Sequence, residues 1–198
     1  MMGSTFIVVL AWLVVLALWG AAVYNRLRLL RNRVENAWSQ IDVQLKRRHD
    51  LIPNLVEVAR GYMQHEASTL EAVARARSQA VQASEALRGH TGQAQALGAL
   101  AAAEQALGSS LGRLMVVAEA YPELKADAQM QSLSEEIAST ENRIGFARQA
   151  YNDEVMAFNN KASQFPDLIW ARLLGFAHMD MLQSTMNAQE RQAPSVRF

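Results

Sequence analysis

A run of apolar residues near the N-terminus, Phe6 to Tyr24, constrains this chain more than any other feature. The run holds 19 residues and no charged side chain. As an α-helix it would span about 29 Å, close to the thickness of the hydrocarbon core of a bilayer. Aromatic and basic side chains, which favour the membrane interface, follow at its C-terminal end: Trp19, Tyr24, Arg26, Arg28, Arg31 and Arg33. The sequence therefore predicts a transmembrane anchor over residues 1–24.

Two other interpretations of this run remain open. A secretory signal peptide would need a basic segment in front of the apolar run, and residues 1–5 carry no basic side chain, although Gly20-Ala21-Ala22 resembles a cleavage site. A buried core helix would need later segments able to enclose it, and none is apolar on all faces. For an anchor, the excess of arginine after the run predicts a single-pass protein with its N-terminus outside and its domain in the cytoplasm.

The composition of the whole chain excludes several classes of protein. Lys and Arg together number 19 and so do Asp and Glu, so a nucleic-acid partner recruited by bulk positive charge is not expected. The absence of cysteine excludes disulfides, thiolate metal sites, cysteine nucleophiles and a lipoprotein anchor. Abundant alanine and only 4 prolines favour an all-α fold.

Apolar residues recur at steps of three and four in four long segments, which we expect to be helices. The segments are 25–49, 53–87, 93–120 and 128–164. Pro53 favours a reversal near His49 to Ile52, with a kinked continuous helix as the alternative. Gly89 to Gly92 predicts the second turn, Pro122 predicts the third boundary, and Asp127 or Ser132 could cap the last long helix.

The expected architecture is a transmembrane helix that continues into an antiparallel four-helix bundle with long helices. The bundle domain would cover residues 25–176, and the apolar segment Leu168 to Phe176 would pack across one end of it. Residues 177–198 form a polar C-terminal tail that composition alone predicts to be disordered. Its apolar stripe of Met179, Met181, Leu182 and Met186, with a terminal aromatic, predicts instead that the tail docks on a neighbouring subunit.

Polar residues that interrupt the apolar seams form a candidate buried polar network: His65, Thr69, Glu104, Thr140 and Asn152. We favour a network that fixes helix register over a metal or proton site. His65-Glu66 begins an HExxH pattern, but Thr69 stands where the second histidine would be. We therefore expect no metal, no cofactor and no enzymatic activity.

Charged residues on the segment 128–164 form a candidate partner or subunit surface, together with the C-terminal residue: Glu141, Arg143, Arg148 and Phe198. Salt bridges between helices of the same bundle are the alternative interpretation of these charges.

Motifs along most of the chain resemble the LemA family of bacterial membrane proteins. They include Tyr24-Asn25-Arg26-Leu27, Val34-Glu35-Asn36-Ala37-Trp38, Asp50-Leu51-Ile52-Pro53-Asn54, Ala120-Tyr121-Pro122-Glu123-Leu124, Thr140-Glu141-Asn142-Arg143-Ile144 and Gly175-Phe176. The resemblance implies one N-terminal span in a bacterial inner membrane and a helical bundle, and it carries over no catalytic residue. A member of the family takes part in building magnetosome membranes, which implies membrane organisation as a family theme.

Together these observations predict a non-enzymatic, single-pass, membrane-anchored helical scaffold that self-associates and organises the membrane or recruits protein partners. Its expected partners are the lipid bilayer, other copies of the chain and a membrane protein of unknown identity. The alternatives are an accessory subunit of another membrane complex, such as a protease or secretion system, and a metal- or proton-linked sensor built on His65 and Glu104.

Overall fold

A computed structural model describes residues 2–87 and 93–182 of the chain. These residues form six helices and no strand, which confirms the all-α prediction. The helices are α1 (Met2–Tyr62), α2 (Ala67–Ala86), α3 (Ala94–Ala118), α4 (Pro122–Ala126), α5 (Ala128–Ser163) and α6 (Asp167–Leu173). The turn predicted at Gly89 to Gly92 lies outside the described residues.

Helix α1 contains 61 residues and runs through Pro53 without a break, so the predicted reversal near His49 to Ile52 is wrong and the continuous alternative holds. The ring of Pro53 is exposed, while Ile52 and Leu55 beside it are fully buried. A proline inside a helix costs about 3 kcal/mol, and each fully buried Leu or Ile returns roughly 1.5–3 kcal/mol. A reversal at Pro53 would interrupt the apolar stripe of α1, whereas the continuous helix keeps that stripe on the core.

The reversal instead occupies Met63 to Glu66, so the second long helix begins at Ala67 rather than at residue 53. Met63 is buried at the end of α1, where its N–H bonds the carbonyl of Ala59 at 2.9 Å. The N–H of Glu66 then bonds the carbonyl of Met63 at 3.1 Å, which closes the turn before α2 starts.

The two later long helices match their predicted segments. Helices α3 and α5 begin and end within two residues of the predicted 93–120 and 128–164. Pro122 occupies the first turn of α4, and the side chain of Asp127 caps α5 by accepting hydrogen bonds from the N–H groups of Gln129 and Met130, each at 2.9 Å. Of the two candidate caps, Asp127 is therefore the one used.

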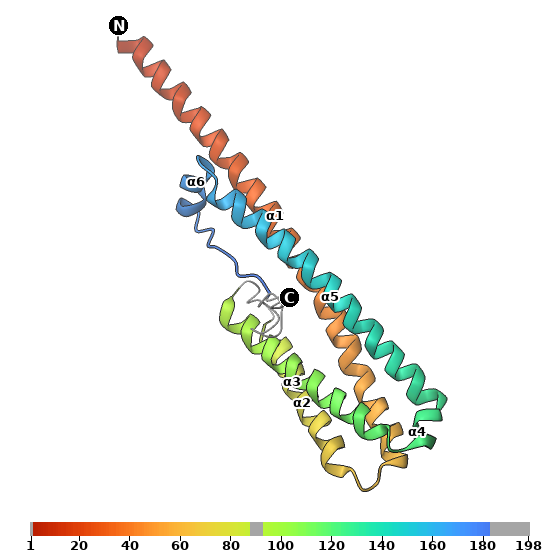
Figure 1. The fold of residues 1–198 in the computed structure, drawn as a ribbon. Coiled ribbons are helices and arrows are strands. Elements are labelled where there is room, and N and C mark those ends of the chain that lie inside the picture. Colours follow the sequence, from red (N-terminus) through yellow and green to blue (C-terminus); the bar gives the residue numbers. More distant parts are fainter. Residues whose placement is uncertain (1, 88–92, 183–198) are drawn as a thin grey trace, which may run out of the picture.

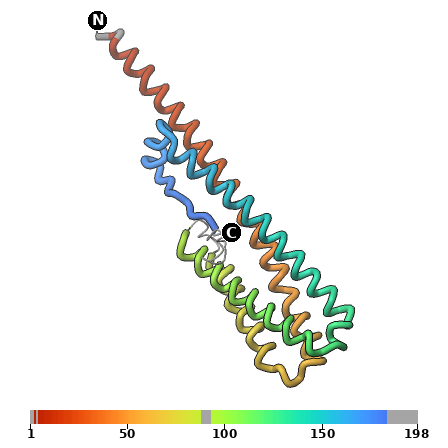
Figure 2. Tube along the Cα trace, viewed as in Figure 1, coloured from red at the N-terminus to blue at the C-terminus, as the bar shows by residue number. Residues whose placement is uncertain are grey.

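The long helices pack as two antiparallel pairs (Figure 1). Helices α1 and α5 lie side by side along the molecule, and α2 with α3 forms a shorter hairpin against the part of α1 far from the N-terminus. The first turns of α1 project beyond every other element, and the same rod-like outline is seen in the tube drawing (Figure 2). The short helix α6 lies beside α1 where the projecting part begins.

Two apolar cores succeed one another along this rod. The core near α6 contains, on α1, Val23, Leu27, Leu30, Val34, Trp38, Ile41 and Leu45. The distal core contains, on α1, Ile52, Leu55, Val56, Ala59 and Met63. Between them, Arg48 and His49 of α1, Glu104 of α3 and Thr140 of α5 are buried. A polar layer thus separates the two cores.

Candidate functional site: the projecting end and the polar layer

The projecting part of α1 is apolar and exposed. Helix α1 is the one helix among the described residues that is long and apolar enough to cross a membrane, and only 11% of its most apolar window is buried. Large side chains such as Phe6, Trp12 and Leu18 are 66–68% exposed. This exposure separates the segment from the core helix of a water-soluble domain, which would be mostly buried.

Helix α6 packs against the last turns of this apolar segment. The rings of Trp19 and Trp170 meet edge to face with their centroids 6.1 Å apart. Gly20 permits this approach, because a Cβ at that position would lie 3.0 Å from ring carbons of Trp170. The rings of Tyr24 and Phe176 are 5.8 Å apart. The apolar segment and the domain are therefore joined by side-chain packing as well as by continuous helix.

The C-terminal end of α6 aims Phe176 at α1. Gly175 has a φ of 73°, in the left-handed region that favours glycine. The N–H of Phe176 bonds the carbonyl of Ala171 at 2.9 Å, and the N–H of Gly175 bonds the carbonyl of Arg172 at 3.2 Å. This pair of bonds is a Schellman motif, which ends a helix and redirects the chain. At the other end, Lys161 of α5 holds Asp167 through an ion pair of 2.5 Å.

The residues predicted for the membrane interface gather at this end of the domain. Trp19 is half-buried against α6, and Tyr24 is exposed over much of its surface. The four arginines lie on the exposed surface of α1 in the turns that follow: Arg26, Arg28, Arg31 and Arg33. One of them, Arg31, also pairs with Glu35 at 3.3 Å.

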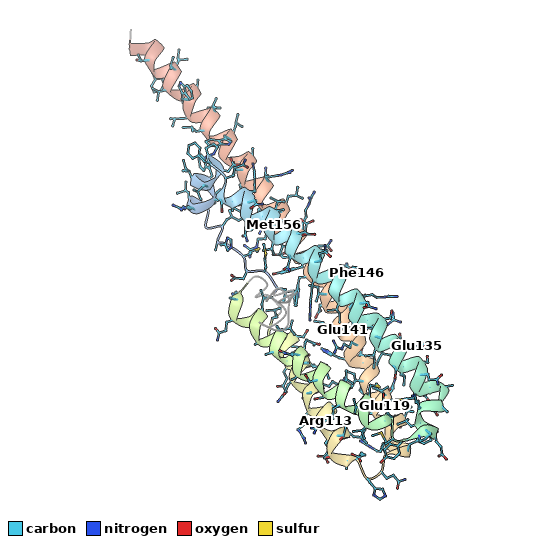
Figure 3. The ribbon with its side chains drawn as sticks, viewed as in Figure 1. Arg113, Glu119, Glu135, Glu141, Phe146 and Met156 are labelled. Carbon is cyan, nitrogen blue, oxygen red and sulfur yellow. The ribbon has the colours of Figure 1, made fainter. Side chains whose placement is uncertain are left out.

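The polar layer is an ion cluster built around one turn of α1. Glu104, on α3, is almost completely buried, and one of its oxygens lies 2.7 Å from Nε2 of His49. Its other oxygen lies 3.4 Å from Nη1 of Arg48 as an ion pair, without the alignment of a hydrogen bond. The same guanidinium nitrogen also binds the carboxylate of Glu141 on α5, a residue that Figure 3 places on that helix. A buried carboxylate is thereby compensated from α1.

Helix α2 joins the same layer through a contact with the backbone of α1. The Nε–H of Arg77 donates a hydrogen bond of 2.6 Å to the carbonyl of His49. The turn that contains Arg48 and His49 therefore contacts α2, α3 and α5 at one level. A one-turn slip of α3 or α5 would separate the buried Arg48 from a carboxylate partner, and a slip of α2 would break the bond from Arg77. The cluster therefore specifies the helix register.

The residues predicted to form one buried polar network do not lie together in the structure. His65 is exposed in the turn between α1 and α2, away from any buried layer. Thr69 and Thr140 are buried, and the hydroxyl of Thr140 donates to the carbonyl of Ile137 within its own helix at 2.7 Å. Glu104 binds His49, which the sequence-based network did not include. The available signal was the spacing of His49, which continues the apolar stripe of α1 between Leu45 and Ile52.

Asn152 and the nearby Asn159 hold the start of the C-terminal tail against α5. The side-chain amide of Asn159 bonds both the N–H and the carbonyl of Met179, at 3.0 and 2.8 Å. Asn152 binds Leu182 in the same way, with both distances 2.8 Å. Met179 and Leu182 at the start of the tail are therefore held on α5 of their own chain, and docking of the tail on a neighbouring subunit stays a prediction. The rest of the tail, with Met186 and Phe198, lies outside the described residues.

The charged residues predicted to form one surface on α5 also differ in their surroundings. Glu141 is half-buried in the ion cluster, which agrees with the alternative of salt bridges within the bundle. Arg143 is exposed. Arg148 is half-buried and lines a cavity of about 460 Å³, together with residues of α1, α3 and the start of the tail. Within residues 2–87 and 93–182, no three His, Asp or Glu side chains are grouped in a way that could hold a metal ion.

Comparison with known proteins agrees with the sequence motifs. Two magnetosome proteins of Paramagnetospirillum magneticum, MamQ 1 and MamQ 2, are each 26% identical to this chain over 175 residues, which cover 81% of the chain. MamQ of Magnetospirillum gryphiswaldense is 24% identical over 172 residues, which cover 79% of the chain. The chain spans 63–64% of the length of these curated relatives. The profile of the LemA family matches residues 37–198, so the chain belongs to the LemA family.

Proposed function

We propose that this protein is a non-enzymatic, single-pass membrane-anchored scaffold that self-associates and organises the membrane or recruits protein partners. Its apolar N-terminal segment crosses the bacterial inner membrane, and the helical domain projects into the cytoplasm. The other expected partner is a membrane protein that binds the projecting domain.

One observation carries this proposal: α1 is at once the exposed apolar segment and the longest helix of the domain. No flexible linker separates Tyr24 from the first core, because Val23 and Leu27 are already buried. A rigid connection fixes the distance and tilt of the domain relative to the bilayer. Such geometry suits a scaffold, which has to present a surface at a defined position, better than a tethered enzyme.

Self-association is supported by an exposed aromatic residue near Arg143, the exposed helical member of the charged surface predicted on α5. Phe146 is 74% exposed on α5 and lies one helical turn after Arg143, which is also exposed. Figure 3 labels Phe146 on α5. Exposed aromatic and arginine side chains are enriched at protein–protein interfaces. The names of the MamQ relatives, as magnetosome proteins, support a role at a membrane compartment.

Two measurements on the full-length protein test the proposal. The protein should remain in the membrane pellet after alkaline carbonate extraction, and its mass in mild detergent should be that of a closed oligomer. Phe146→Ser should lower that mass, while Val116→Ser, at a similarly exposed position on α3, should leave it unchanged. Release by carbonate would refute the anchor. A monomer in detergent would refute self-association and favour the accessory-subunit alternative.

A further inference from the structure

The outer side of α6 carries large apolar residues that nothing in the described chain covers. Phe165 is 78% exposed, Ile169 is 58% exposed and Leu173 is 73% exposed. They recur at four-residue steps, which places the two helical members on one face. Leu174 is exposed beside them, while Trp170 and Ala171 pack inward against α1. We call Phe165, Ile169, Leu173 and Leu174 the α6 surface.

The position of α6 along α1 gives the depth of this surface. The freely exposed part of the apolar segment, residues 6–18, rises only about 20 Å as a helix, which is about 10 Å short of a bilayer core. Residues 19–24 are needed to complete the span. Within this stretch, Trp19 and Gly20 contact Trp170 of α6, and Tyr24 contacts Phe176, which follows α6. The α6 surface therefore lies level with the end of the span, close to the boundary between acyl chains and headgroups.

We propose that the α6 surface is a second membrane contact, which lies in the lipid boundary beside the span and on the same side as the domain. This inference rests on the proposed anchor. Apolar residues exposed together mark interaction sites, and short amphipathic elements with neighbouring cations settle in the interface layer. Arg172 on α6 and Arg26 and Arg28 on α1 are exposed and can bind anionic headgroups.

Lipid is favoured as the occupant because the α6 surface adjoins the exposed apolar face of α1. Leu16 and Leu18 continue the exposed apolar residues from the span to the level of α6. The packed rings of Trp19 and Trp170 also stand at the depth where aromatic belts form. With two contacts on one bilayer, the rod is fixed in rotation as well as in depth, because α6 lies on one side of α1.

The natural absence of cysteine permits a direct depth measurement on the full chain. Single cysteines at Leu173→Cys, Leu10→Cys and Val116→Cys are labelled with an environment-sensitive fluorophore. The proteins are reconstituted in vesicles of phosphatidylethanolamine and phosphatidylglycerol that carry nitroxide lipids. Leu10 reports the span, and Val116 is a distal position whose exposed fraction of 68% is close to the 73% of Leu173.

The fluorescence of the label at residue 173 should be quenched more strongly by nitroxides near the headgroups than by nitroxides deep in the bilayer. The label at residue 116 should be quenched by neither. The label at residue 10 should be quenched by deep nitroxides. If residue 10 is quenched and residue 173 behaves as residue 116 does, the α6 proposal is wrong and the anchor stands. If residue 173 is quenched and residue 10 is not, α6 touches lipid but the span is wrong, and the proposal of a second contact beside a span fails with it.

Quenching at neither position 10 nor position 173 would refute the anchor and the α6 contact together. A blue-shifted label at residue 173 without quenching by lipid nitroxides would mean that protein covers the surface. That outcome would replace lipid with a second copy of the chain and overturn the proposal.

Discussion

Glu104 is the residue on which the polar layer depends, because it compensates Arg48 and binds His49 while lying almost out of reach of water. Replacing it with alanine should reduce the free energy of unfolding by about 3–5 kcal/mol, since it removes the one fully buried carboxylate that pairs with Arg48 and His49 and leaves Arg48 with only the half-buried Glu141. Chemical denaturation of the detergent-solubilised protein measures the change.

The surface ion pair between Arg47 and Glu136 provides a matched control on neighbouring turns of the same two helices as Arg48 and Glu141. Glu136→Ala should change the free energy of unfolding by about 0–1 kcal/mol, as is usual for exposed pairs. Equal effects of Glu104→Ala and Glu136→Ala would contradict the assignment of Glu104 to a buried cluster.

Asp127 predicts a pH dependence of stability. Its pKa is lowered, chiefly by the hydrogen bond from the N–H of Met130, with smaller contributions from the hydroxyl of Tyr62 and the N–H of Gln129. The same Asp127–Tyr62 hydrogen bond raises the pKa of Tyr62. Because the folded-state pKa of Asp127 lies below its unfolded value of 3.8, its stabilisation is complete above that value and is lost as the pH falls through the folded pKa.

Asp127→Ala should therefore lower Tm at neutral pH, and the difference from the parent protein should shrink as the pH falls below 3.8 and through the lower folded-state pKa of Asp127. Tyr62→Phe is the control, because it removes the hydroxyl and leaves both backbone bonds of the cap in place. A difference in Tm that persists unchanged into acid would show that the cap does not act through the ionised carboxylate.

At the scale of the element, α5 shows what can be predicted from sequence. Apolar residues recur at steps of three and four along the whole helix, for about ten turns. Residues that this spacing places on the apolar stripe, such as Ile144, Val155 and Phe158, are buried. Ile144→Ala or Phe158→Ala should each cost about 2–5 kcal/mol of unfolding free energy. Gly145→Ala, next to Ile144 with no atom near the added methyl group, is the control and should not destabilise the protein. A melt of either large-to-small variant indistinguishable from the parent would refute this register.

Helix α1 shows why other features were missed. A proline is a local signal for a break, and its cost of about 3 kcal/mol is real, but the decision is made by residues that meet Ile52 and Leu55 from elsewhere in the chain. Local spacing does not reveal those partners. Because a break was predicted at Pro53, the reversal was placed too early and His49 was assigned to a turn. Its pairing with Glu104, 55 residues away in sequence, was therefore not predicted. His65, placed in a seam by continuing the wrong helix, is exposed instead.

For the whole molecule, the continuous helix α1 joins the apolar segment rigidly to the domain. The direction in which the segment crosses the membrane therefore decides on which side the domain lies. The basic cluster of Arg26, Arg28, Arg31 and Arg33 follows the apolar segment, and residues 1–5 carry no basic side chain. Since positive residues are retained on the cytoplasmic side, the domain should be cytoplasmic. A reporter fused after Phe198 should be active in the cytoplasm and silent in the periplasm.

A second readout of orientation avoids the fusion. Val43→Cys places an exposed thiol on the domain part of α1 in a chain without other cysteines. A membrane-impermeant maleimide should label it only after the cells are opened. Replacing the four arginines with glutamine and adding lysines at the N-terminus should reverse the preference, because the bias depends on the distribution of Lys and Arg on either side of the span. Labelling of the Val43→Cys protein in intact cells would show that the domain faces outward, and would reopen the interpretation of the apolar segment as an export signal.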